Sequence, residues 1–157
     1  MDAVGLEILE RELAADRKVL ADAAGKAEQR VGEKNPGHLE ACAYELARFY
    51  TVFERMLQNI CEAFENHFEY QGDWHERLIA RVTLELPGLR PAFLPESAAS
   101  DVRELKRFRH LIRHAYDLTL REDRIRELVE IASKVNAAAP GWSTGFTAAV
   151  RRGQGWS

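Results

Sequence analysis

The chain has 157 residues, 46% of them hydrophobic, and carries a formal net charge of −3 at pH 7. A chain of this length can bury roughly two-thirds of its unfolded surface in one domain, so it needs no disulfide or metal to fold. The acidic balance excludes a protein that coats nucleic acid with its whole surface, and any RNA contact must come from a local basic segment. Residues 103–113, RELKRFRHLIR, form such a segment, with five Arg or Lys residues against one Glu.

Apolar residues recur at helical spacing through most of the chain, which predicts an all-α protein. The first helix is predicted over residues 2–31 and ends in the segment 31–37, which is rich in helix breakers. The second helix is predicted over 38–69, and its apolar stripe is the strongest candidate for the core. That stripe consists of Leu39, Cys42, Leu46, Phe49, Phe53, Leu57, Ile60, Phe64 and Phe68.

Three shorter helices are predicted in the second half of the chain. One covers residues 74–86 and is followed by a loop rich in Pro and Gly. The next begins near Asp101, where Asp101-x-x-Glu104 has the form of a capping box. The last begins near Thr119, at a second capping box that is completed by Glu122.

Short connections between these helices favour an antiparallel bundle of about five helices. The last helix is predicted to end at Ala137–Pro140, so the bundle forms one domain over residues 1–139. The remaining residues, 140–157, are Gly-rich and lack clear periodicity, and they are expected to form a flexible C-terminal tail.

The two cysteines, Cys42 and Cys61, are expected to be free and to pack in the core. They lie on one predicted helix and are separated by roughly 28 Å at the helical rise, so they cannot form a disulfide within it. Free cysteines are typical of a reducing compartment. The N-terminal segment lacks the basic start and apolar run of a signal peptide, and no apolar stretch approaches the ~20 residues of a membrane span. We therefore expect a cytoplasmic protein with no membrane partner.

The fourth predicted helix concentrates the polar residues that could carry chemistry. At 100° per residue, Arg107, His110 and His114 share one face of this helix. Arg109 and Tyr116 share another direction, at the edge of the core side. The core side itself is expected to consist of Leu105, Phe108, Ile112 and Ala115.

Two imidazoles beside several guanidinium groups suit RNA cleavage by internal transfer. This reaction needs a base for the proton of the 2′-OH, an acid for the leaving 5′ oxygen, and cations that stabilise the charge on phosphorus. Histidine can act as base or acid at cellular pH, and arginine holds phosphate oxygens in bidentate fashion. No metal or other cofactor is required. An arginine-rich helix face is more often only a solvated surface, so the spacing alone does not identify a catalytic site.

The run RHLIRHAY, from Arg109 to Tyr116, resembles the motif of the HEPN family. That motif is an Arg, four to six residues and a His, commonly with a polar residue directly after the Arg. The HepT branch extends it to Arg-x4-His-x-Tyr, which Arg109, His114 and Tyr116 match. His110 stands where Asn is usual. The position of the motif in a chain of about five helices and the long second helix agree with the same family.

The resemblance implies an endoribonuclease toxin that needs no metal and cleaves cellular RNA, with tRNA as one candidate. It implies a homodimer whose two motifs build one composite cleft. His114 would be the general base or acid and Arg109 would stabilise the phosphate, with His110 and Arg113 as accessory groups. The resemblance also implies a partner nucleotidyltransferase antitoxin that adds AMP to Tyr116, where the new negative charge would repel RNA phosphates.

The geometry of an ideal helix leaves the identity of the phosphate-binding arginine open. Arg109 and His114 are about 140° apart around the helix, so they converge only across a dimer axis or at a distorted helix end. Arg107 shares a face with His114 and is the second candidate.

Two other functions stay open at this point. A non-catalytic helical subunit that binds a nucleotidyltransferase would resemble this fold, although such proteins generally lack the Arg–His motif. A plain helical interaction protein is the other alternative. The sequence assigns no function to His38, His67 or His75.

Overall fold

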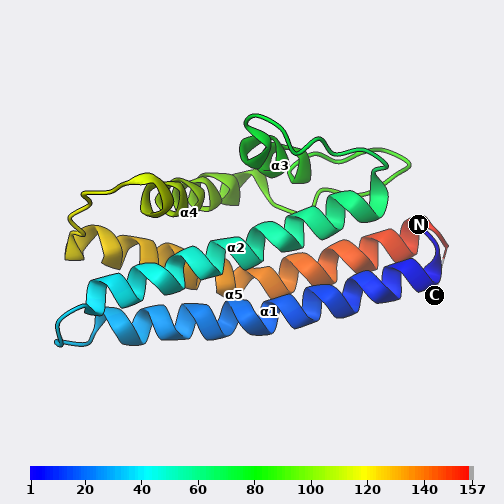
Figure 1. Cartoon of the computed structure of the whole chain (residues 1–157). Helices are drawn as coiled ribbons and strands as arrows, with labels where there is room; N and C mark the ends of the chain where they lie inside the picture. The colour runs from blue at the N-terminus through cyan, green and yellow to red at the C-terminus, as the bar shows by residue number, and fades with distance from the viewer. Residues whose placement is uncertain (156–157) are drawn as a thin grey trace.

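Five α-helices make up the computed structural model, which describes residues 1–155 (Figure 1). The described part of the chain contains no β-strand beyond an isolated bridge. The predicted all-α bundle of about five helices is therefore confirmed. No helix within residues 1–155 is long and apolar enough to cross a membrane. In chain order the helices are α1 (Ala3–Val31), α2 (His38–Phe64), α3 (Trp74–Val82), α4 (Glu96–His114) and α5 (Glu122–Gly153).

Three long helices, α1, α2 and α5, lie side by side and form the body of the bundle (Figure 1). α1 runs antiparallel to both α2 and α5, and the short connection 32–37 joins α1 to α2. α4 packs against α2 and α5, and α3 packs on α2 and α4. The α3–α4 layer is therefore the part of the molecule that presents the motif residues.

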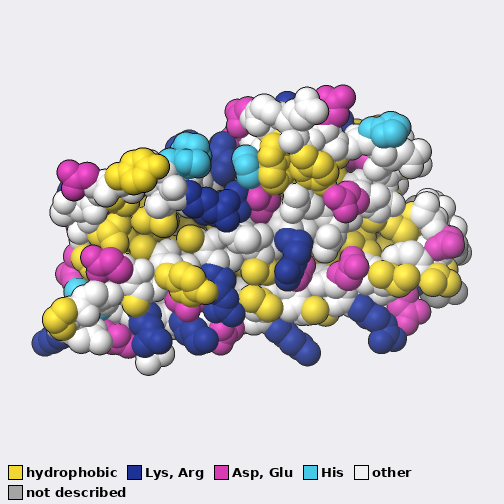
Figure 2. Space-filling model, in the orientation of Figure 1, with side chains coloured by type: hydrophobic (Ala, Val, Ile, Leu, Met, Phe, Trp, Pro, Cys, Tyr) yellow, Lys and Arg dark blue, Asp and Glu magenta, His cyan; other side chains and the backbone are white. Residues whose placement is uncertain are grey.

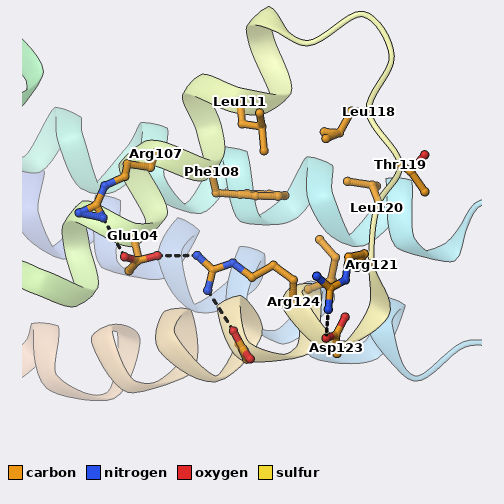
Figure 3. Close-up of a pocket in the computed structure, with 12 residues that line it drawn as sticks. Glu104, Arg107, Phe108, Leu111, Leu118, Thr119, Leu120, Arg121, Asp123 and Arg124 are labelled. Carbon is orange, nitrogen blue, oxygen red and sulfur yellow. Dashed lines mark hydrogen bonds and ion pairs between the residues drawn. The ribbon is translucent and has the colours of Figure 1, made fainter.

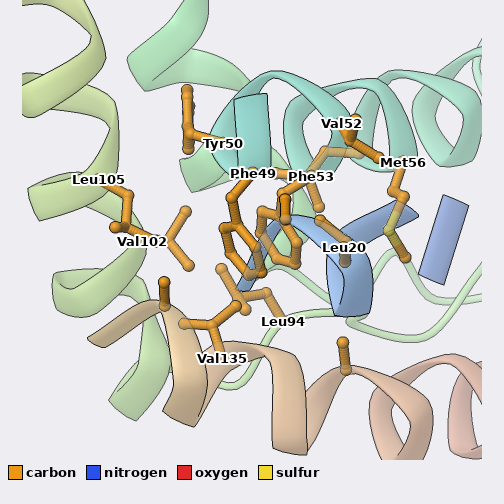
Figure 4. Close-up of a cluster of buried hydrophobic side chains, with 14 of the residues drawn as sticks. Leu20, Phe49, Tyr50, Val52, Phe53, Met56, Leu94, Val102, Leu105 and Val135 are labelled. Carbon is orange, nitrogen blue, oxygen red and sulfur yellow. The ribbon is translucent and has the colours of Figure 1, made fainter. Parts of the chain in front are cut away.

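The core is centred on the aromatic stripe of α2 (Figure 4). Phe49 and Phe53 are fully buried on this helix. They lie among Leu20 of α1, Val102 of α4 and Val135 of α5. Burying a side chain of this size stabilises a fold by about 1.5–3 kcal/mol. The predicted stripe is thus confirmed as the centre of the core from Cys42 to Phe64, whereas Leu39 and Phe68 are only partly buried and Phe68 lies beyond the end of α2.

Small side chains let α1 approach α2 closely. Ala27 of α1 is buried at this contact, and Cys42 Sγ of α2 donates a hydrogen bond to its carbonyl oxygen at 3.4 Å. Cys42 and Cys61 are both free and fully buried, as predicted. Burial raises the pKa of Cys42 to about 11 and the pKa of Cys61 to about 12, so neither side chain is a reactive thiolate at neutral pH.

A buried arginine organises the chain between α3 and α4. Arg90 donates to Glu65 Oε1 at 2.8 and 3.2 Å and to three backbone carbonyl oxygens. Glu65 is the extended residue that caps α2 directly after Phe64, so this helix ends short of its predicted end. Val82 ends α3, also early, because its carbonyl oxygen accepts hydrogen bonds from the N–H groups of Phe93 and Leu94 instead of continuing the helix.

The two predicted capping boxes are wrong. α4 begins directly after Pro95, whose fixed φ and extended ψ set the start of the helix, so Asp101 lies inside it. The carboxylate of Asp101 pairs with Lys134 of α5 at 2.8 Å. α5 begins at Glu122 without any side-chain cap, so Thr119 does not cap it. A capping pattern is local, whereas these carboxylates and helix ends are determined by neighbouring elements.

The predicted end of α5 at Ala137–Pro140, and with it the flexible tail, is also wrong. α5 continues through Pro140 to Gly153. Proline removes one backbone hydrogen bond, and the nearby glycines are poor helix formers, which explains the sequence-based expectation. Residues 156–157 of the predicted tail lie outside the described residues.

Tertiary contacts hold the last part of α5 in place. Phe146 is only 3% exposed, and its ring packs edge-on against Phe64 and Phe93 with centroid distances of 5.6 and 5.7 Å. Arg151 forms an ion pair with Glu10 of α1 at 2.6 Å. Packing of this kind outweighs weak local helix propensity.

We expect Phe146→Ala to lower the free energy of unfolding by about 3–5 kcal/mol, because it removes a buried aromatic ring from the packed end of α5. Thr144→Ala, at an exposed position of the same helix, should change it by less than about 0.5 kcal/mol. Urea denaturation followed by circular dichroism measures both values. Equal and small effects would show that this segment does not pack on the bundle.

Candidate active site

The core face of α4 is the one that the sequence predicts over most of its length. Leu105 and Phe108 are buried, and Ile112 packs against the core. Ala115 is the exception, because it is the extended residue that follows the last turn. The opposite, polar side of α4 is thereby turned away from the bundle.

α4 ends at His114, two residues before the end of the motif. Tyr116 therefore follows the helix, where its side chain is fully exposed, while Arg109 is buried within the helix. The prediction that Tyr116 and Arg109 share a direction is wrong, because the ideal helical register stops at His114.

A pocket of about 310 Å³ lies between α4 and the start of α3, and we call it the histidine pocket. Every predicted site residue except Tyr116 contributes to its wall. Figure 2 shows histidine and basic side chains gathered over this side of the molecule. Among residues 1–155 no group of three His, Cys, Asp or Glu side chains is placed to hold a metal ion. The pocket is lined by Asp73, His75, Lys106, Arg107, Arg109, His110, Arg113 and His114.

Two imidazoles meet on the outer side of α4. His110 and His114 lie one turn apart, with ring centroids separated by 4.3 Å and ring planes inclined by 43°. Arg113 is exposed beside them and forms no ion pair with any of residues 1–155. The pocket therefore combines two neighbouring imidazoles with a guanidinium whose charge no carboxylate of the described chain neutralises.

Two other cations of the pocket are paired with carboxylates. Lys106 Nζ lies 2.6 Å from Glu76, which also accepts a hydrogen bond from Arg103 at 2.5 Å. Burial acts to raise the pKa of Glu76, but these two hydrogen bonds outweigh it and lower that pKa, so the carboxylate is ionised at neutral pH. Arg107 pairs with Glu104 at 2.7 Å on the surface, where a phosphate can compete for the guanidinium.

Arg109 differs from the other cations because it is buried, with only 4% of its surface exposed. Its Nη2 donates to both carboxylate oxygens of Glu54, at 2.9 and 3.0 Å, and its Nη1 donates to the hydroxyl of Thr51 at 3.3 Å. The guanidinium also lies 4.4 Å from the centre of the Tyr50 ring, a cation–π contact. These contacts leave Arg109 committed to the protein interior.

Glu54 also forms hydrogen bonds with two other side chains. Its Oε2 accepts from the Tyr50 hydroxyl at 3.1 Å and lies 2.6 Å from Nδ1 of His75. Burial, together with the charge of Glu54, raises the pKa of Tyr50, so its hydroxyl remains a donor. Sequence reasoning missed His75 and Glu54. The sequence did contain one sign of this pair: Glu54 stands inside the apolar run of α2, and a carboxylate buried there needs a partner.

A second groove, of about 400 Å³, lies between α4, the loop 115–121 and the start of α5 (Figure 3). Its arginines are neutralised within the groove: Arg121 pairs with Asp123 at 2.6 Å, and Arg124 pairs with Glu104. Balanced charge makes this groove less suited than the histidine pocket to a polyanion.

A scan against protein-family models matches residues 41–150, most of the chain, to the family described as HepT-like protein. The chain belongs to the HepT-like family. The match runs from α2 to α5 of this HepT-like protein and contains the whole Arg-x4-His-x-Tyr motif. It also contains residues 140–150, which pack as part of α5. The family expected from the motif is thereby confirmed. No curated protein and no solved structure matches the chain.

In this HepT-like protein, Arg109→Ala is expected to lower the free energy of unfolding by about 3–5 kcal/mol, because it leaves Glu54 as an unpaired buried charge. Arg107→Ala, which removes only a surface ion pair, should cost less than about 1 kcal/mol. Urea denaturation compares the two variants. An Arg109→Ala protein as stable as Arg107→Ala would contradict the structural role of Arg109.

Proposed function

We propose that this HepT-like protein is an endoribonuclease toxin that cleaves cellular RNA without a metal ion. The observation that supports this proposal is the histidine pocket, where His110 and His114 converge with Arg113, a guanidinium without an ion pair in the described part of the chain. Imidazoles can move protons at neutral pH, and a free guanidinium can bind the phosphate on which charge develops. Transfer RNA is one candidate substrate.

We assign the roles of the pocket side chains from which of them are exposed and which are buried. His114, at the exposed end of α4, acts as general acid or base, and His110 supports it. Arg113 and Arg107 contact the phosphate, because both guanidinium groups are exposed. The commitment of Arg109 to Glu54 supports Arg107 over Arg109 as the motif's phosphate ligand. Arg109 then acts by holding the wall of the pocket.

We further propose that two copies of the chain form a homodimer with a composite cleft. The histidines and Arg113 lie on an open surface, which a second copy could complete. Leu111, in the middle of the motif, is 45% exposed, and a second copy in this position would cover it. A composite cleft would place two sets of cations along one RNA strand.

The proposed partner is a nucleotidyltransferase antitoxin that adds AMP to Tyr116. Full exposure of Tyr116, on the loop that follows α4, makes its hydroxyl accessible to such an enzyme. The added phosphate would place negative charge within a few residues of His114 and would repel the phosphates of RNA.

RNA cleavage should depend on His114 and not on added metal. We expect purified protein to cut end-labelled cellular RNA in the presence of EDTA, and His114→Ala to slow cleavage by about 10²–10⁴-fold, the usual contribution of one general acid or base. His67→Ala is the matched control, because His67 is exposed and lies outside the histidine pocket. Intact RNA with wild-type protein that nevertheless binds a nucleotidyltransferase would indicate the alternative, a non-catalytic binding subunit.

Modification should be specific for Tyr116. Incubation with the partner nucleotidyltransferase and ATP is expected to add AMP to the wild-type protein and to abolish its RNA cleavage. Tyr116→Phe should remain unmodified, whereas Tyr44→Phe, which changes another exposed tyrosine, should be modified like wild type. Intact-mass spectrometry and peptide mapping give the site. Modification of Tyr116→Phe at the wild-type level would refute this assignment.

A further inference from the structure

His75 belongs to a carboxylate–imidazole pair that no motif marks. It is the second residue of α3, and its Nδ1 lies 2.6 Å from Oε2 of Glu54 on α2. Arg109 donates to both oxygens of Glu54 and so holds it as the carboxylate, which can only accept hydrogen bonds. The proton of the short contact must therefore reside on Nδ1. When the ring is neutral, His75 is therefore the Nδ1–H tautomer.

The ring of His75 is restrained by its surroundings as well as by this hydrogen bond. Trp74 stacks on it, with ring centroids 3.7 Å apart and planes inclined by 29°. The guanidinium of Arg109 lies beside Nδ1, at 3.2 Å from Nη2. A ring held by stacking and by a buried carboxylate keeps one orientation, which is the arrangement that positions a reacting imidazole.

The other nitrogen of this ring is free. Nε2 of His75 has no hydrogen-bond partner among residues 1–155, and the side chain is 35% exposed at the wall of the histidine pocket. In the Nδ1–H tautomer Nε2 carries a lone pair and can only accept a proton. His75 thus offers an oriented proton acceptor to the same pocket that contains His110 and His114.

We propose that His75 is the general base of the histidine pocket and that Glu54 is its positioning residue. The inference rests on the proposed function, RNA cleavage. Nε2 of His75 takes the proton of the 2′-OH as the 2′ oxygen forms a bond to phosphorus. The bond from phosphorus to the 5′ oxygen breaks, and protonated His114 gives its proton to that oxygen. The products are a 2′,3′-cyclic phosphate and a 5′-hydroxyl, with one proton taken and one given.

A base and an acid can be distinguished by the leaving group. The linkage that wild-type protein cuts is first mapped, and an RNA oligonucleotide is then made with sulfur in place of the 5′ oxygen at that linkage. A thiolate leaves without protonation, so loss of the acid no longer matters, whereas loss of the base still does. We expect His75→Ala to slow cleavage of both substrates by about 10²–10⁴-fold. His114→Ala should be slow on the oxygen linkage and close to wild type on the sulfur linkage.

Two further measurements separate a catalytic His75 from one that only ties α3 to α2. Added imidazole should restore part of the activity of His75→Ala, because it can occupy the vacated place, and should leave His67→Ala unchanged. Nitrogen-15 NMR of the wild-type protein should show the Nδ1–H tautomer for His75, which requires no variant to fold.

The outcomes are separable. Cleavage by His75→Ala at the wild-type rate, its recovery on the sulfur linkage, or an Nε2–H tautomer in wild type would each overturn the assignment of His75 as base. Wild-type protein that cuts neither substrate would overturn the proposed function itself, and with it the reaction that His75 would serve. This result is measured with the wild-type protein alone and does not depend on any variant.

Discussion

The buried ion pair between Arg109 and Glu54 is the interaction on which the candidate site depends. Removing two charges from water is costly, and the pair is stable only because its remaining hydrogen-bonding capacity is used. Tyr50 and His75 donate to the same carboxylate, and Thr51 accepts from the guanidinium. Since Glu54 belongs to α2, Arg109 to α4 and His75 to α3, one carboxylate fixes all three helices around the histidine pocket.

A second buried pair follows the same plan. Arg90, between α3 and α4, bonds to Glu65 at the C-terminal end of α2, as Arg109 bonds to Glu54 nearer the middle of that helix. The α3–α4 layer is thus attached to α2 by two buried arginines as well as by apolar packing. Each arginine also satisfies neighbouring hydroxyl or carbonyl oxygens, so desolvation leaves few of its donors without a partner.

The cations of the motif helix look alike in the sequence and differ in the fold. Arg109 is buried, Lys106 and Arg107 are paired with carboxylates, and Arg113 forms no ion pair within residues 1–155. On this helix, pairing and burial leave Arg113, next to the two imidazoles, as the cation that is free to bind an anion. An acidic protein can in this way still present a local site for a phosphate.

The sequence by itself determined the helical fold, the α2 core stripe and the motif, because helical periodicity and the order Arg-x4-His-x-Tyr are properties of neighbouring residues. It did not determine that α5 continues past Pro140, where packing of Phe146 outweighs poor local propensity. Nor did it join Glu54 and His75 to Arg109, since these three residues lie far apart in the chain. Only tertiary packing brings them together, and only the resulting burial separates a structural arginine from one that is free to bind phosphate.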